Sequence, residues 1–379
     1  MDVAVIGGGP AGTRVAKQLA EAGFETIVLE ANREIGKPVR CAGLVSPRVV
    51  SMTKTGSVVK EGYKAVISPP NGNELILEAP EPRAYVIDRV GFDREMAEKA
   101  VDNGAELILG AKAVDTSYDD TRDITYRKSG KLNKINADLV IGADGPNSIM
   151  RKRTGLPGPK EMLVGIQSII ARESEDIHIF LGKDVSPDFF GWELPHPSGT
   201  LVGVASNDGN AYGHLKNLIK KRGYETKIIG YSAGTIPLGH IKKSVTDGLM
   251  LVGDAACQVK PLSGGGLFPG LLSADICAEV AIDALENEDT SEEKLREYHK
   301  RWQKDIGSEI SKGMWMRKIF KGITDKEMSD MINALKNEKV KRVVEEVGDI
   351  DYPSTLAKPV LKASPKLIKF AGPMIKNIF

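Results

Sequence analysis

Cysteine is scarce in this sequence, which has only Cys41, Cys257 and Cys277 among 379 residues. Three scattered cysteines do not make a disulfide framework, and their small number favours a reducing, cytoplasmic setting. The sequence has no C-x-x-C pair and no spaced set of cysteines, so we expect no iron–sulfur cluster and no other metal site.

Long apolar runs and a targeting signal are also missing. No stretch reaches about 18 uninterrupted apolar residues, the length that a conventional membrane-spanning helix requires. The first residues include no basic segment and no cleavage site, so a secretory signal is not expected. We therefore predict a protein that does not cross a bilayer.

An excess of one charge is absent too, since 52 lysines and arginines face 51 aspartates and glutamates. This balance gives no global attraction to nucleic acid, which we do not expect as a partner. Hydrophobic residues make up 41% and charged residues 27%, as in an ordinary globular protein. The length exceeds that of a usual single core, so two or three subdomains are expected.

The chain opens with the pattern of a βαβ unit. Residues 3–6 are expected to form a buried strand, residues 11–22 a helix and residues 26–30 a second strand. Later apolar runs predict strands at 107–109, 123–127, 139–141, 178–181, 200–205 and 249–252, and helices at 92–103 and 269–285. The pattern predicts an α/β nucleotide-binding fold, of Rossmann type, with an α+β insert and a helical C-terminal region.

Three glycines mark the turn of this first unit. Gly7 allows the tight turn, Gly9 lets the backbone approach a pyrophosphate, and Gly12 lets the helix pack closely on the strand. Glu30 ends the next strand, where its carboxylate can accept hydrogen bonds from an adenosine ribose and disfavours a 2′-phosphate. The site should therefore hold FAD or NAD rather than NADP.

A second glycine-rich turn far along the chain decides between these two cofactors. The segment 249–266, LMLVGDAACQVKPLSGGG, predicts a buried strand that ends next to Asp254. Residues 263–266 then precede a helix whose N-terminus can face the N1–carbonyl edge of a flavin and stabilise its anionic reduced form. NAD does not need such a distant second arm, so FAD is favoured.

Three short motifs resemble the FAD fingerprints of the aromatic-hydroxylase-type flavoproteins. They are GGGPAG at 7–12, ADGPNS at 143–148 and GDAA at 253–256, and their order and spacing match over about 260 residues. The resemblance implies that Asp144 supports the cofactor fold and that Asp254 binds the ribityl–phosphate stretch of FAD.

Further motifs resemble the geranylgeranyl reductase family. They are PVRCAG at 38–43, GWELP at 191–195 and PLSGGG at 261–266, and Phe190 keeps an aromatic residue two positions before Trp192. The resemblance covers about residues 1–290. It implies reduction of carbon–carbon double bonds in a prenylated lipid of the archaeal ether type. The cofactor contacts predicted from the glycine turns and this resemblance are Gly7, Gly9, Ala11, Gly12, Glu30, Arg40, Cys41, Ala42, Leu44, Arg89, Ala113, Asp144, Asp254, Gly265, Gly266 and Leu267.

The proton for such a reduction requires a positioned acid in a dry cavity. Cys41, or a water that it orients, is one candidate, and Glu193 is another if it faces the cavity. Trp192 is expected to cover the substrate. Packing roles are the alternative for Cys41 and Trp192, since thiols and tryptophans are often simply buried. Arg40 is placed either to lower the pKa of Cys41 or to hold a substrate phosphate.

We expect three parts in the chain. Residues 1–52, 86–158 and 240–286 form the FAD-binding domain, residues 53–85 and 159–239 a β-rich substrate-cavity domain, and residues 287–379 a helical region. No second dinucleotide fingerprint is visible, so NAD(P)H and a donor protein such as ferredoxin stay open as electron sources. An FAD-dependent monooxygenase or halogenase and an electron-transfer flavoprotein–quinone oxidoreductase are the alternative functions.

The end of the chain is basic, with five lysines and no acidic residue between 352 and 379. Apolar residues alternate with these lysines, so the segment is suited to peripheral contact with an anionic lipid surface. A helical tail that packs on its own domain is the alternative.

Overall fold

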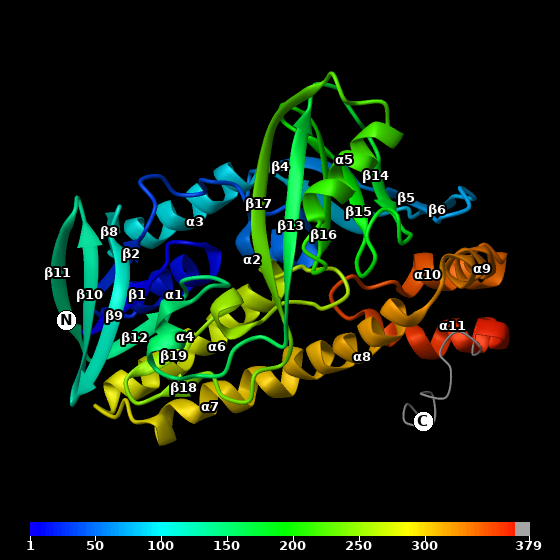
Figure 1. Ribbon diagram of the computed structural model, residues 1–379. Coiled ribbons are helices and arrows are strands. Elements are labelled where there is room, and N and C mark those ends of the chain that lie inside the picture. Colours follow the sequence, from blue (N-terminus) through cyan, green and yellow to red (C-terminus); the bar gives the residue numbers. More distant parts are fainter. Residues whose placement is uncertain (368–379) are drawn as a thin grey trace.

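A six-stranded sheet forms the core of one half of the protein and combines strands from residues 3–142 with two strands from residues 245–251 (Figure 1). The computed structural model describes residues 1–367, and the lysine-containing end of the tail, residues 368–379, lies outside the described residues. All neighbours in the sheet are parallel except the first pair. In order across the sheet, the strands are β18 (Val245–Thr246), β19 (Leu249–Leu251), β12 (Leu139–Gly142), β1 (Val3–Ile6), β2 (Thr26–Glu30) and β8 (Glu106–Leu109).

Helices cover one face of this sheet and a smaller sheet covers the other. Parallel sheets are usually buried on both faces, which explains why the side chains of the central strand β1 are all buried. The helix α1 packs against α3 and α6. The covering elements are α1 (Pro10–Glu21), α3 (Arg89–Asp102), α6 (Leu267–Glu286) and the sheet of β11 (Lys131–Ala137), β10 (Thr121–Lys128) and β9 (Lys112–Asp119).

Two features of this half differ from the sequence-based expectations. The helix expected at 92–103 begins three residues earlier, at Arg89, because the Asp88 carboxylate accepts hydrogen bonds from the amides of Val90 and Gly91 and caps it. The small sheet has three strands, whereas only its middle strand was expected. Its outer strands are largely polar and exposed, so their composition indicated loops.

A seven-stranded sheet forms the second layer, seen upright in Figure 1 with the long strands β13 and β17. Two strands from the N-terminal third complete it, since β5 pairs with β14 and β6 pairs with β5. Across the sheet, the strands are β17 (Ile228–Leu238), β13 (Glu161–Ile170), β16 (Gly199–Ser206), β15 (Gly191–His196), β14 (Ile177–Phe180), β5 (Lys64–Ser68) and β6 (Leu75–Glu78).

Short elements join the two sheets. A three-stranded sheet of β3, β7 and β4 lies beside them, and α5 packs on β13 and β16. These elements are β3 (Leu44–Val45), α2 (Pro47–Thr53), β4 (Val58–Gly62), β7 (Ala84–Ile87), α4 (Ile149–Arg153), α5 (Ala211–Lys221) and the 3₁₀ turn η1 (Gly253–Ala256).

The C-terminal region is helical, as expected, and runs below both sheets before turning back toward β6 (Figure 1). No helix among residues 1–367 is long and apolar enough to span a membrane. The elements are α7 (Glu292–Trp302), the π-helical turn η2 (Gln303–Gly307), α8 (Ser308–Gly322), α9 (Asp325–Leu335), α10 (Glu338–Val347), η3 (Pro353–Leu356), α11 (Ala357–Ala363) and η4 (Pro365–Leu367).

Candidate active site

A cavity of about 720 Å³ lies where the two sheets and the C-terminal region meet. It runs from the first glycine turn, past the glycine-rich loop before α6, to the inner face of the seven-stranded sheet. Thirteen of the residues predicted for the site line it: Gly9, Ala11, Gly12, Arg40, Cys41, Ala42, Leu44, Arg89, Trp192, Asp254, Gly265, Gly266 and Leu267. Residues more than 250 positions apart in the chain therefore share one wall.

The first glycine turn has the shape that a dinucleotide requires. A Cβ atom at Gly7 would lie 2.3 Å from the Ala143 carbonyl oxygen, and one at Gly12 would lie 2.1 Å from the Gly7 carbonyl oxygen. A Cβ atom at Gly9 would meet no atom within 4 Å. Gly9 therefore leaves open space at the N-terminus of α1, where the helix dipole favours a pyrophosphate. The residues present fit FAD at this end.

Glu30 lies beside this turn, outside the cavity lining. One of its carboxylate oxygens accepts from the Gly8 amide at 2.8 Å and the other from the Asn32 amide at 2.7 Å. The second oxygen also accepts from the Asn32 side chain at 2.6 Å. These bonds fix the carboxylate at the end of β2, and the oxygen that faces Gly8 keeps a further acceptor site. Ala113, in β9, also lies outside the lining.

Asp144 supports the structure rather than lining the cavity. Its Oδ2 atom accepts from the amides of Ile149 and Met150 at the start of α4, and its Oδ1 atom is buried without a partner. A buried carboxylate oxygen without a hydrogen-bond partner is energetically costly. The free Oδ1 atom of Asp144 is therefore suited to accept a hydrogen bond from a group that binds next to Ala143 and Gly145.

The Asp254 turn is held from behind by buried hydrogen bonds. The Gln258 side chain accepts from the Gly253 amide and donates to the Tyr298 hydroxyl, which in turn donates to the Leu251 carbonyl oxygen. In front of the turn, a Cβ atom at Gly266 would lie 2.7 Å from Asp254 Oδ1, so only glycine fits there. The carboxylate is thus fixed where α6 begins.

Burial raises the pKa of Asp254 to about 6, although Arg89 opposes the shift. Between the ordinary value of 3.8 and this value, the folded protein binds more protons than the unfolded chain, so stability falls as pH rises through that window. Ionised Asp254 is therefore unfavourable for the FAD-free protein.

Asp254→Asn is therefore expected to stabilise the FAD-free protein above pH 6 and to flatten its stability between pH 4 and 6. Thermal unfolding as a function of pH measures this. The same variant should bind FAD more weakly, because the amide cannot accept hydrogen bonds at both of its ends. If the stability of FAD-free Asp254→Asn depended on pH as that of the wild type does, the raised pKa of Asp254 would be contradicted.

Cys41 lines the cavity and is half-buried. Its sulfur accepts from the Gly43 amide at 3.5 Å, and its carbonyl oxygen accepts from the Gln167 side chain of β13 at 3.3 Å. The Arg89 guanidinium interacts with the thiol and forms a two-point ion pair with Asp93, at 2.9 and 3.0 Å. Cys41 is therefore held in place beside a fixed positive charge.

The aromatic residues Phe189, Phe190 and Trp192 line the cavity from the second sheet. The Phe189 and Phe190 rings stack with centroids 4.2 Å apart, and Phe190 meets Trp192 edge-on. The Trp192 indole lies flat on the partner strand at Gly203, where a Cβ atom would be 2.4 Å from its ring. Phe189 directly precedes Phe190, and no sequence motif pointed to it.

Glu193 points away from the cavity, which corrects the expectation that it is a cavity acid. Successive side chains of a strand alternate between faces, so Trp192 and Leu194 face the cavity and Glu193 faces the opposite side. There it is 2% exposed and forms an ion pair with Arg222 at 2.8 Å. A buried, paired carboxylate of this kind is structural.

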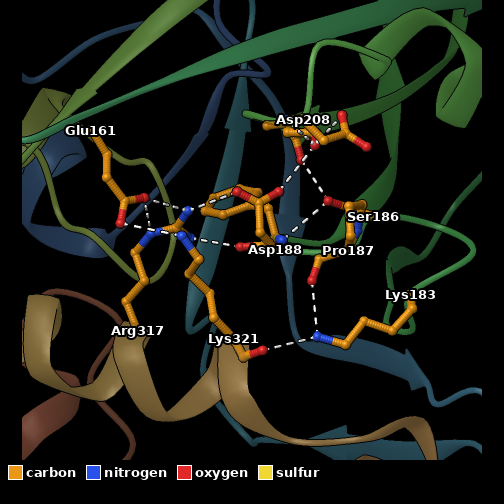
Figure 2. A network of polar contacts seen from close by, with 11 residues as sticks. Glu161, Lys183, Ser186, Pro187, Asp188, Asp208, Arg317 and Lys321 are labelled. Atoms are coloured by element: carbon orange, nitrogen blue, oxygen red, sulfur yellow. Dashed lines mark hydrogen bonds and ion pairs between the residues drawn. The ribbon is translucent and has the colours of Figure 1, made fainter.

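A buried polar network fixes the loop that carries the stacked phenylalanines (Figure 2). Arg317 of α8 donates to Glu161 of β13 at 2.9 and 3.0 Å, and to the Asp188 carbonyl oxygen at 2.8 Å. It also pairs with the Asp188 carboxylate at 3.2 Å. The network therefore links the C-terminal region to the residue directly before Phe189.

Arg317→Met is expected to lower the stability of the protein by about 3 to 5 kcal/mol, because it leaves the buried Asp188 carboxylate without a cation and with only the Ser206 hydroxyl as a side-chain partner. Lys321→Met is the matched control, since Lys321 contacts the same Glu161 from a more exposed position and should cost less than about 1 kcal/mol. The midpoint of urea unfolding measures both. Equal losses in the two variants would refute this role of Arg317.

The chain is similar to known FAD-binding proteins and reductases. The family model described as "FAD binding domain" matches residues 1–184. The chain is 31% identical over 363 residues to a digeranylgeranylglycerophospholipid reductase of Methanothrix thermoacetophila, covering 90% of this chain and 93% of the relative. It is 32% identical over 406 residues to digeranylgeranylglycerophospholipid reductase 2 of Methanopyrus kandleri, covering 99% of both.

A solved structure has the same fold along the whole chain. It is described as a geranylgeranyl bacteriochlorophyll reductase-like protein of Thermoplasma acidophilum. The TM-score is 0.88 at 22% identity, and the match covers 100% of this chain and 99% of that one. The likeness extends to the helical C-terminal region, beyond the residues that the sequence motifs cover.

Proposed function

Because the chain belongs to the digeranylgeranylglycerophospholipid reductase family, whose members are FAD-dependent oxidoreductases, we propose that it saturates the geranylgeranyl chains of an archaeal-type ether phospholipid. The observation that carries this proposal is the cavity, which joins the FAD-binding turns to a wall of apolar side chains. An elongated apolar chain with isolated double bonds fits such a wall.

The apolar wall comes from the substrate side of the molecule. It includes Ile177 and Ile179 of β14, Leu194 of β15 and Leu77 of β6, and residues of the C-terminal region such as Leu356 extend it. These side chains exclude water from a prenyl chain and bind it by burial of apolar surface. An isolated alkene has no carbonyl group that could accept negative charge during reduction. Its reduction therefore depends on controlled delivery of a proton, which requires a site that excludes water.

When bound in its reduced form, FAD supplies the hydride that adds to one alkene carbon. A proton must reach the other carbon, and Cys41 holds one at Sγ on the cavity wall. The Gly43 amide donates to this sulfur at 3.5 Å, and the Arg89 cation lines the same cavity. Trp192 and the stacked phenylalanines hold the prenyl chain against the same wall. Arg40, which is exposed at the cavity, is placed for a phosphate group.

The test is the anaerobic reoxidation of the flavin. Protein loaded with FAD and reduced with dithionite is mixed with a digeranylgeranyl lipid or with its fully saturated counterpart. We expect the oxidised flavin spectrum to return only with the unsaturated lipid. Reoxidation that requires oxygen, with the lipid unchanged, would instead indicate a monooxygenase or halogenase on the same fold.

We propose NAD(P)H or a donor protein such as ferredoxin as the source of electrons. Anaerobic reduction of the flavin by each donor in turn distinguishes them.

Peripheral membrane contact through residues 352–379 stays a prediction. Sedimentation of the protein with anionic and neutral vesicles tests it.

A further inference from the structure

Lys260 is a nearly buried cation at the cavity that neither the glycine motifs nor the family resemblance singled out. It is 8% exposed and lies between η1 and α6. Its Nζ atom donates to Asp351 Oδ1 at 2.7 Å and to the Ile350 carbonyl oxygen at 2.9 Å. Asp351 is completely buried. Lys260 lines the same cavity as the FAD-binding turns.

The backbone of Lys260 is part of the glycine-rich loop that begins α6. Its carbonyl oxygen accepts from the Gly264 amide at 2.8 Å, and its amide donates to the Gly265 carbonyl oxygen at 3.1 Å. A Cβ atom at Gly265 would lie 3.5 Å from Lys260 Nζ. The ammonium group is therefore directly beside the loop that the sequence assigns to the N1–carbonyl edge of the flavin.

The counter-charge of Lys260 comes from a different part of the chain. Asp351 lies after α10, and its second oxygen pairs with Arg48 at 3.2 Å. Arg48 also pairs with Asp349 at 2.7 Å. Two cations and two anions thus form one chain of ion pairs, in which Lys260 and Asp349 line the cavity, and the C-terminal segment supplies both anions. Buried ion pairs add little net stability over well-packed apolar residues, so stability does not explain this arrangement.

We propose that Lys260 raises the reduction potential of bound FAD and that Asp351 limits this effect. Reduction adds negative charge to the flavin, and a nearby cation in a partly buried site favours the more negative form. Asp351 offsets part of that charge. The geometry thus makes the C-terminal segment a determinant of flavin chemistry. The inference rests on FAD binding and is independent of the lipid substrate.

The test is the two-electron midpoint potential of the FAD-loaded protein, measured by equilibration with a reference dye. Lys260→Met is expected to favour oxidised flavin about tenfold, which corresponds to about 30 mV for a two-electron couple. Asp351→Asn is expected to shift the potential in the opposite direction. Lys260→Arg keeps the charge and should stay close to the wild type.

Lys183→Met is the matched control. Lys183 also holds the C-terminal region, through hydrogen bonds to the carbonyl oxygens of Pro187 and Lys321, but it does not line the cavity. The midpoint potential of FAD bound to Lys183→Met should equal that of the wild type. An unchanged potential in FAD-loaded Lys260→Met, or shifts of the same sign in Lys260→Met and Asp351→Asn, would overturn the proposal.

If Lys260→Met does not retain FAD, Asp351→Asn decides alone, and an unshifted or lowered potential in that variant refutes the proposal. A wild-type protein that binds no FAD would instead refute the proposed function itself. Flavin absorbance after gel filtration separates these two failures.

Discussion

Replacing Gly9 by leucine is expected to weaken FAD binding at least about 100-fold, or about 2.8 kcal/mol, without unfolding the protein. The backbone of Gly9 is extended, with φ −77°, so a side chain is tolerated there. That side chain would point into open space at the start of α1, where the pyrophosphate of FAD is expected. Titration of the FAD-free protein with FAD, followed by flavin fluorescence, measures the loss.

Gly230→Leu is the matched control for this variant. A Cβ atom at Gly230 also meets no atom within 4 Å, but this residue lies in β17 and does not line the cavity. It should bind FAD as the wild type does. Wild-type affinity in Gly9→Leu would show that the dinucleotide does not lie at this turn. By contrast, Gly12→Leu would test only folding, since its Cβ would overlap the Gly7 carbonyl oxygen.

Cys41→Ala is expected to slow the reduction of the lipid about 100-fold or more, the usual contribution of a positioned general acid. The rate should be measured in a single turnover with protein reduced beforehand, so that the electron donor does not limit it. Cys41→Ser should recover part of the rate, because a hydroxyl can also carry a proton at this position.

Cys277→Ala is the control for loss of a thiol. Cys277 is buried in α6, and burial alone raises the pKa of its thiol, so it takes no part in proton transfer. This variant should keep the wild-type rate. A full rate in Cys41→Ala would assign Cys41 to packing and leave an ordered water as the proton source.

The FAD-binding part of the fold could be predicted from local sequence. The strands at 3–6 and 26–30 have apolar centres and are entirely or almost entirely buried, and the glycines between them permit contacts that any Cβ atom would prevent. Such signals lie within about thirty residues of each other, so they are visible without the fold.

Glu193 shows why the substrate side was harder to predict. Its motif places it next to Trp192, but the face that it occupies depends on the register of β15, and its partner Arg222 is 29 residues away. Lys260 and Asp351 are 91 residues apart, and neither has a motif that points to the other. Long-range pairs of this kind are decided by packing, which periodicity does not reveal.

Mass spectrometry of the lipid after anaerobic incubation with reduced, FAD-loaded protein is the most direct test of the central claim. We predict that a digeranylgeranyl lipid gains two hydrogen atoms for each double bond reduced, and that Gly9→Leu leaves its mass unchanged. A lipid whose mass stays the same with the wild-type protein, while the flavin remains bound and reduced, would contradict the account.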